Sequence, residues 1–357
     1  MTIDGSLSCW SDVVGRLDRG HAGILLGNGA SMAISTMFSY TSLFDVVCRQ
    51  QNLSEAEIQV FDEFRTRNFE EVLYNLKVSS RTCTCFRFPV RNLGQLDESY
   101  EVIRNALIFA VRTVHPQPHA VTEAVRQRTA DHLANYRDVY TTNYDLMIFW
   151  SIAGKRYEEV TSTGKTKIKE FKDFIWNQER IFDPADTEVW SNTIGVHFLH
   201  GGLHLYYHRL TGATHKHKTL SEPPLVYFEN NQDLLPLFVS EGDSTSKMRS
   251  IRRNEYLSFA YSRFVRHQGD LVIFGHSLNS QTDFHIVEAV RRWPELDQRR
   301  SGGKKPKKKR VIAIASRSSD GSERVRQEKH RFLGLLDPGK FEVLFFDSAT
   351  HPLSHQT

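Results

Sequence analysis

The chain has 357 residues, of which 39% are hydrophobic and 25% charged, and a formal net charge of +4. These values are typical of a globular protein with one large domain or two ordinary ones. The sequence has no run of about 18 apolar residues and no signal-peptide core in its first twenty residues, so we expect a cytoplasmic protein without a membrane segment. The four scattered cysteines form no C-x-x-C pair, which excludes a zinc knuckle and argues against a disulfide framework.

The first part of the sequence predicts a strand that turns tightly into a helix. Residues 8–20 have the pattern of a short amphipathic helix, and the apolar run 24–26 predicts a buried strand. The small residues 27–31 (GNGAS) follow directly. Glycines at such a turn let the backbone approach a ligand, and a helix start favours a pyrophosphate, so this stretch indicates a nucleotide site. The third glycine of a G-x-G-x-x-G motif is replaced by Met32.

A helical region follows the first strand. Between residues 37 and 136, apolar residues recur at spacings of three and four, and one helix ends at Val114, before the helix-breaking stretch 115–118. We interpret residues 37–136 as a helical module inserted after the first βα unit.

The next predicted strand is residues 138–141, and an apolar segment, 146–152, follows it. Residues 153–190 show no clear periodicity. Two alternating runs, 195–200 and 203–207, flank a Gly-Gly pair and predict a β-hairpin.

The last third of the chain alternates between helices and strands. We expect a loop with a basic, histidine-containing tip at 215–218 and a helix at 251–264. We further expect a strand at 270–274, a helix at 282–292, and strands at 311–315 and 341–346 with a helix between them. Strands separated by helices predict an α/β fold with a Rossmann-like, doubly wound, mainly parallel sheet.

Small, polar or titratable residues follow each expected strand. Ligands of open α/β sheets bind outside the carboxyl ends of the strands, so these residues define the candidate site. They are Gly27 to Ser31, Thr142 to Asp145, His200-Gly201, Gly275 to Leu278, and Asp347-Ser348.

Four of these groups, taken in order, resemble the motifs of the sirtuin family and its zinc-free bacterial relatives. The motifs are Gly27-x-Gly29-Ala30-Ser31, Thr142-Asn143-x-Asp145, His200-Gly201 and Gly275-x-Ser277-Leu278. The resemblance spans about residues 22–290. It implies a Rossmann-like NAD-binding domain made of residues 1–36 and 137–357, with the module of residues 37–136 covering NAD.

The resemblance also implies a role for each matched residue. Asn143 and His200 would be catalytic, with Asn143 near the nicotinamide ribose and His200 a base facing ribose hydroxyls or a water. A base with a pKa near neutrality suits this chemistry, because breaking the nicotinamide–ribose bond passes through an oxocarbenium-like state. The residues expected to bind NAD are Gly27, Asn28, Gly29, Ala30, Ser31, Thr142, Asp145, Gly275, His276 and Ser277.

Two departures from the family pattern direct the functional prediction. The two C-x-x-C pairs of protein-deacylating sirtuins are missing, and residues 37–40 read Met-Phe-Ser-Tyr where those enzymes have Pro-Asp-Phe-Arg. We therefore expect NAD hydrolysis to nicotinamide and ADP-ribose, as in sirtuin-like effectors of bacterial antiphage defence. Such effectors often act as homo-oligomers or beside a second protein of the defence system.

Other functions stay open on the sequence. The chain could be a non-catalytic sensor of NAD or an ADP-ribose derivative, or an NAD-dependent protein deacylase or ADP-ribosyltransferase. Six histidines between residues 197 and 217 suggest a metal, but no H-E-x-x-H motif or nearby acidic pair supports one, and we expect none. Residues 299–310 carry eight basic side chains without aromatic residues. We expect a solvated loop there, and nucleic acid could bind only through it.

Overall fold

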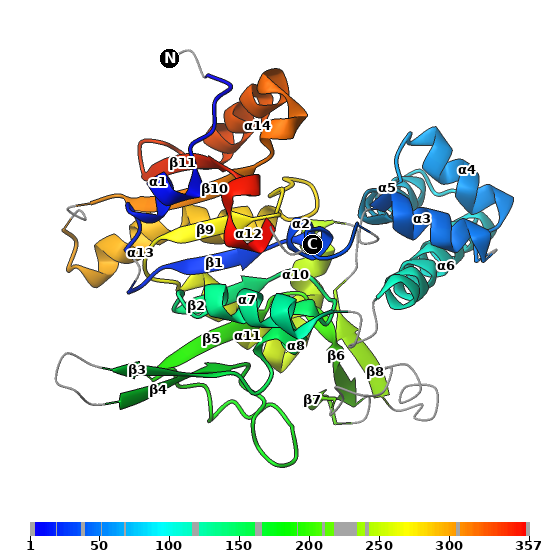
Figure 1. Ribbon diagram of the computed structural model, residues 1–357. Helices are drawn as coiled ribbons and strands as arrows, with labels where there is room; N and C mark the ends of the chain where they lie inside the picture. Colours follow the sequence, from blue (N-terminus) through cyan, green and yellow to red (C-terminus); the bar gives the residue numbers. More distant parts are fainter. Residues whose placement is uncertain are drawn as a thin grey trace.

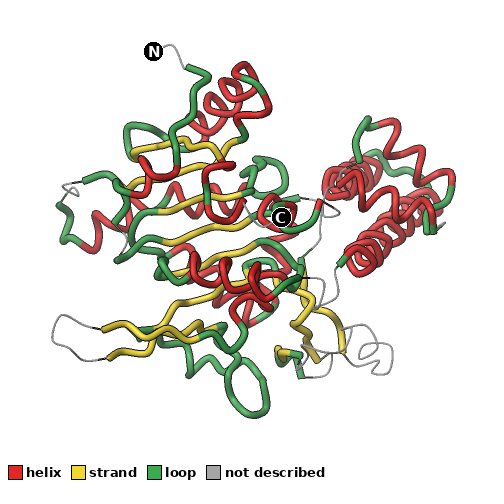
Figure 2. The backbone as a smooth tube through the Cα atoms, in the orientation of Figure 1, coloured by secondary structure: helices red, strands yellow, loops and turns green. Residues whose placement is uncertain are grey.

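A computed structural model of the chain shows an α/β protein (Figures 1 and 2). It describes residues 4–18, 20–36, 40–50, 52–67, 69–115, 121–160, 166–190, 192–208, 211–217, 234–239, 243–304 and 308–354. Residues 37–39, which belong to the segment that departs from the Pro-Asp-Phe-Arg pattern of protein-deacylating sirtuins, therefore lie outside the described residues.

An eight-stranded sheet forms the centre of the protein, in the order β11-β10-β9-β1-β2-β5-β4-β3. Six neighbouring strands, from β11 to β5, are parallel, and in chain order they have the 3-2-1-4-5-6 arrangement of the Rossmann fold; β4 also pairs in parallel with β5. The predicted fold class is confirmed. These strands are β1 (Gly23–Leu26), β2 (Asp138–Thr141), β5 (Thr193–Phe198), β9 (Leu271–Phe274), β10 (Arg310–Ser316) and β11 (Phe341–Asp347).

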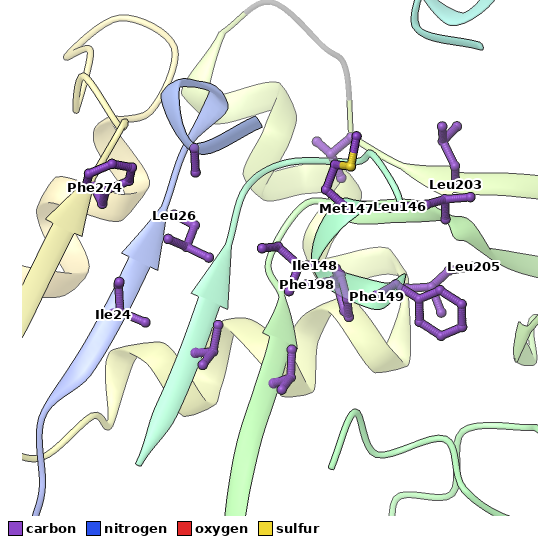
Figure 3. Close-up of a cluster of buried hydrophobic side chains, with 14 of the residues drawn as sticks. Ile24, Leu26, Leu146, Met147, Ile148, Phe149, Phe198, Leu203, Leu205 and Phe274 are labelled. Carbon is purple, nitrogen blue, oxygen red and sulfur yellow. The ribbon is translucent and has the colours of Figure 1, made fainter. Parts of the chain in front are cut away.

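Helices cover both faces of the sheet because successive strand residues point to opposite sides. Ile24 and Leu26 belong to one buried cluster and Leu25 to another. Figure 3 shows the first cluster, in which Met147 and Phe149 lie near Phe198. The helices on this face of the sheet are α1 (Trp10–Val14), α7 (Glu123–Leu133) and α8 (Met147–Ile152). The helices on the other face are α12 (Phe284–Arg291), α13 (Trp293–Arg300), α14 (Ser322–Leu335) and the second half of α11 (Glu255–Val265).

The helical module expected at residues 37–136 is present as four helices beside the sheet (Figure 1). Phe61 of the module packs on Phe44 and Phe69, with ring centroids 4.8 and 5.1 Å apart. The four helices are α3 (Tyr40–Arg49), α4 (Glu55–Glu63), α5 (Phe69–Cys85) and α6 (Val90–Val114). Helix α7, which the sequence pattern grouped with them, lies over the sheet next to α8 in Figure 1. The insertion that stands apart from the sheet is thus α3 to α6.

The predicted hairpin across Gly201-Gly202 is wrong. β5 pairs in parallel with β2, whereas β6 (Gly201–His208) belongs to a second sheet of order β7-β6-β8. Gly201 has φ +75°, so the chain turns there from one sheet into the other rather than back on itself. The partners of β6 are β7 (Thr214–Lys216), which includes part of the expected basic loop, and β8 (Leu234–Phe238).

Three further elements differ from the sequence prediction. Residues 153–190 contain two strands at the sheet edge, β3 (Arg156–Val160) and β4 (Thr166–Lys172). The helix expected at 251–264 is two helices, α10 (Ser244–Arg253) and α11, because the Asn254 side chain caps α11 by accepting a hydrogen bond from Leu257 N.

Short 3-10 turns complete the chain near the carboxyl ends of β10 and β11. They are η3 (Ser318–Asp320), η4 (Ser348–Thr350) and η5 (Pro352–Ser354). Among the helices that the structure describes, none combines the length and the apolar character needed to cross a membrane.

Candidate active site

A cavity of about 680 Å³ lies at the carboxyl edge of the sheet. The residues that follow β1, β2, β5, β9, β10 and β11 all contribute to its wall, and Leu43 of α3 adds a side chain from the helical module. Because β1 has β2 on one side and β9 on the other, the cavity lies where the strand order reverses, which is where Rossmann-like sheets bind ligands.

Most of the residues predicted from the sequence line this cavity. Asn143 and His200 both do, although 57 positions separate them in the sequence. Gly27, Ala30 and Ser31 do not belong to the lining and instead support it from behind. The predicted NAD-binding residues that line the cavity are Asn28, Gly29, Thr142, Asp145, Gly275, His276 and Ser277.

The two glycine loops pack directly against each other. Gly29 N–H donates to the carbonyl oxygen of Gly275 at 2.9 Å, and Ala30 N–H donates to that of Gly27 at 2.9 Å. A Cβ on Gly29 would lie 2.6 Å from Gly275 Cα, so no larger residue fits between the loops. Two N–H groups expected to face a pyrophosphate are thus already bonded, and α2 (Asn28–Met32) is only about one turn long.

A buried hydrogen-bond network fixes Asn143. Its Nδ2 donates to the carbonyl oxygen of Gly27 at 2.9 Å and to Ser31 Oγ at 2.8 Å, which sets the orientation of the amide because a carbonyl can only accept. Ser31 Oγ in turn donates to Asp145 Oδ2, while Asp145 Oδ1 accepts from Met147 N at 2.9 Å. Among the described residues Asn143 Oδ1 has no hydrogen-bond partner, so it is free to accept from a ligand.

His200 lies at the cavity wall beside a second histidine that the sequence analysis missed. The Nε2 atoms of His200 and His285 are 2.9 Å apart, and Nδ1 of His285 is 3.0 Å from Ser244 Oγ. Burial, reinforced by the charge of Lys247, holds the pKa of His200 well below its ordinary value, and burial lowers the pKa of His285 to about 3. Both imidazoles are therefore neutral at pH 7.

A buried ion pair lies behind the two histidines. Lys247 Nζ is 3.1 Å from Asp283 Oδ1, and the lysine is fully buried. Burial alone would raise the pKa of Asp283, but Lys247 and the neighbouring histidines lower it, so the carboxylate is ionised. Burial also lowers the pKa of His276, whose Nδ1 accepts from Leu278 N at 2.9 Å.

One group of side chains could hold a metal ion. Ligand atoms of His200, Asp283 and His285 lie within 4.8 Å of one another, a set of two imidazoles and a carboxylate that suits a divalent transition metal. The charge of Asp283 is already balanced by Lys247, however, and a metal ion would add a second cation to this buried site. We therefore propose no metal here, and the expected absence of one stays a prediction.

The residues after β10 and β11 form a polar wall on the far side of the cavity. Ser316 Oγ donates to Glu328, and Ser318 Oγ donates to Asp347 Oδ2 at 2.5 Å. Of this wall the sequence analysis identified only Asp347-Ser348. Asp283 and His285 could have been noticed, because an Asp-x-His at the start of the helix after Gly275–Leu278 faces the same edge as that loop.

Two strand histidines, His197 and His204, stack on aromatic side chains. His197 Nε2 lies 3.2 Å from Asp138 Oδ1, and its ring stacks between Tyr140 and Phe174. His204 stacks on Phe149, and both its ring nitrogens lack a partner among the described residues.

The ends of the basic run 299–310 take part in the fold. Arg310 makes a two-pronged contact with Asp297 at 2.5 and 2.6 Å, and Arg300 donates to the carbonyl oxygen of Arg266. Residues 305–307 lie outside the described part of the chain. The structure thus gives structural roles to Arg300 and Arg310.

The protein is thus an α/β protein whose sheet has the strand order of the Rossmann fold. A polar cavity lies at the point where that strand order reverses. The chain belongs to the family described as a domain of unknown function (DUF4917), whose model matches residues 24–294. This range contains Asn143, His200 and His285, while β10 and β11 follow it. No curated protein matches the chain.

Proposed function

We propose that this protein is an NAD hydrolase that cleaves the nicotinamide–ribose bond to give nicotinamide and ADP-ribose. The observation that carries the proposal is that Asn143 and His200 follow adjacent parallel strands, β2 and β5, and line one cavity together with the two glycine loops. The ordered sirtuin-like motifs thus lie around one space.

The size and composition of the cavity support a dinucleotide substrate. Its volume of about 680 Å³ lies within the range of about 300 to 1,000 Å³ found for ligand pockets. Its polar wall offers hydrogen-bond partners on both sides, from Asn143 and His200 to Ser316 and Asp347. The short α2 and the bonded N–H groups of Gly29 and Ala30 leave the loop at Gly275 and His276 as the closer candidate for a diphosphate contact.

The chemistry requires one base and one group that orients the reacting ribose or water. The Nδ1 of His200 has no partner among the described residues and can accept a proton, and the residue is neutral at pH 7. Burial holds its pKa well below the near-neutral value expected from the sequence, which corrects that expectation and makes His200 a weaker base than a solvated imidazole. Asn143 presents Oδ1 while Ser31 and Gly27 hold its Nδ2. Bound NAD supplies the glycosidic bond that breaks.

We further propose a role for the activity in the cytoplasm, as an NAD-depleting effector of bacterial antiphage defence. Free cysteines agree with a reducing compartment. Unregulated hydrolysis would deplete the NAD of the host, so control by self-assembly or by a partner protein is expected. A non-catalytic sensor is the main alternative, and it predicts tight NAD binding without nicotinamide release.

The test is to incubate purified protein with NAD and to follow nicotinamide and ADP-ribose by chromatography. We expect release by the wild type, and a loss of at least about 100-fold in Asn143→Ala and in His200→Ala with retained NAD binding. His132→Gln, a change at a buried histidine outside this cavity, is the matched control and should keep wild-type activity. Binding without release by the wild type would favour the sensor, and release unaffected by either active-site substitution would overturn the site assignment.

A further inference from the structure

The interaction between His200 and His285 has no role in the motifs discussed so far. The two residues are 85 positions apart, both are buried, and their Nε2 atoms are 2.9 Å apart. Two neutral imidazoles at this distance share one hydrogen, because one nitrogen must donate and the other accept. The direction of this hydrogen bond decides whether Nδ1 of His200 carries a hydrogen or a lone pair.

Ser244 provides the other end of the chain of contacts. Its Oγ accepts the backbone N–H of His285 at 2.8 Å and lies 3.0 Å from Nδ1 of the same residue. If Ser244 donated its O–H to Nδ1 of His285, the direction would be reversed and His200 would carry its hydrogen on Nδ1. A hydroxyl oxygen can also accept two hydrogen bonds, and in the other arrangement Ser244 Oγ accepts Nδ1–H of His285. Nε2 of His285 is then an acceptor, and it can bind Nε2–H of His200.

We propose that His285 is a positioning residue that accepts Nε2–H of His200 and so leaves the Nδ1 lone pair of His200 available as the base in the cavity. This inference rests on the proposed NAD hydrolysis for its catalytic meaning. When His200 takes a proton at Nδ1, it becomes an imidazolium, and its Nε2–H stays bonded to His285. The proton comes from the water that attacks the ribose C1′, and nicotinamide leaves with the electron pair of the broken C1′–N bond, so no further proton acceptor is needed.

The charged and titratable surroundings agree with this arrangement. The groups that act on His200 are Lys247, His285, Asp283 and His276, in that order of influence after burial itself. Lys247 lowers the pKa of His200 and Asp283 raises it, and burial acts in the same direction as Lys247, so the histidine stays neutral. Both histidines can therefore hold a defined tautomer across the neutral pH range.

The first arm of the test is nuclear magnetic resonance of protein labelled with ¹⁵N-histidine, which reports tautomers without any turnover. Comparison with His200→Gln identifies the His200 signals among the sixteen histidines. We expect one neutral tautomer with hydrogen on Nε2 in the wild type, and a mixture of tautomers in His285→Ala. Hydrogen on Nδ1 in the wild type, or an unchanged tautomer in His285→Ala, would overturn the proposal.

The second arm measures turnover of NAD. We expect His285→Ala to lower kcat about 100-fold with little change in KM, since the base would lose its orientation but the cavity would keep its other contacts. His285→Gln should recover at least about tenfold of this loss, because its amide oxygen can accept from Nε2–H of His200. Equal losses in both variants would show that only the packing of His285 matters and would refute the positioning role.

The two arms separate this inference from the proposed function. If the wild type releases no nicotinamide, NAD hydrolysis fails, and the tautomer measurement alone decides the role of His285. If the wild type is active but His200 has hydrogen on Nδ1, the positioning role fails while the enzymatic proposal stands. His132→Gln serves as the control in both arms and should show the wild-type His200 signals and wild-type turnover.

Discussion

Gly275→Ala tests whether the two glycine loops are packed as closely as the structure shows. Gly275 has φ +68°, which an alanine rarely adopts, and a Cβ there would lie 2.6 Å from both the Cα and the carbonyl carbon of Gly29. These are backbone atoms, so relief requires one loop to move. Gly302→Ala is a matched control, because Gly302 has φ +66° and no atom within 4 Å of the added Cβ.

The difference between the two variants isolates the steric contribution. The left-handed conformation destabilises either alanine by about 1–2 kcal/mol. Overpacking adds about 1–3 kcal/mol at Gly275 only. We therefore expect Gly302→Ala to lower the free energy of unfolding by about 1–2 kcal/mol and Gly275→Ala by about 2–5 kcal/mol.

Urea denaturation of the three proteins, followed by circular dichroism, measures these differences. Calorimetric titration with NAD provides a second reading, because Gly275 lines the cavity and a displaced loop should weaken binding in Gly275→Ala alone. Equal losses of stability in the two variants would refute the close approach of the loops. They would also refute the shape of the cavity where Gly29 and Gly275 line it.

Three further predictions concern buried polar groups. Lys247→Met leaves the buried carboxylate of Asp283 without this ion pair, so we expect the free energy of unfolding in urea to fall by about 3–5 kcal/mol. The double variant Lys247→Met/Asp283→Leu should recover most of this loss. Additive losses from the two substitutions would contradict a direct pairing. Burial lowers the pKa of His132 to about 4, whereas an unfolded histidine titrates near about 6.5. The stabilisation by neutral His132 is therefore complete above about pH 6.5 and lost as the pH falls toward 4. His132→Gln should flatten the dependence of Tm on pH in this window. An unchanged slope would disprove the lowered pKa of His132. Ser31→Ala removes the acceptor that holds Asn143, and it should lower nicotinamide release at least about tenfold while the far-ultraviolet spectrum stays unchanged; full activity would show that Gly27 alone orients the amide.

The amino-acid sequence was sufficient to locate β1, β2, β9, β10 and β11 of the central sheet. Strands such as β1, β9 and β10 are buried on both faces, so they appear as continuous apolar runs that need no tertiary information. Their order along the chain, with helices between them, was enough to predict a doubly wound sheet, and the polar residues after each strand indicated where a ligand would bind.

The missed elements have surroundings that a local pattern does not encode. β3 and β4 are the last two strands at one end of the sheet, and Ile168 of β4 is 47% exposed, so these strands lack the periodicity of half-buried strands. The Gly201-Gly202 pair has the local signature of a hairpin, but a pattern of neighbours along the chain cannot say which sheet each flanking strand joins.

The site itself shows the same division. The residue types of Asn143 and His200 were readable because each directly follows a strand. The pairing of His200 with His285 depended on the order of strands in the sheet, which brings the residues after β5 and the start of α12 to one edge although 85 residues separate the two histidines. Sequence thus determined which chemical groups are present, and tertiary structure decided their hydrogen-bond partners, because those contacts join segments that are distant along the chain.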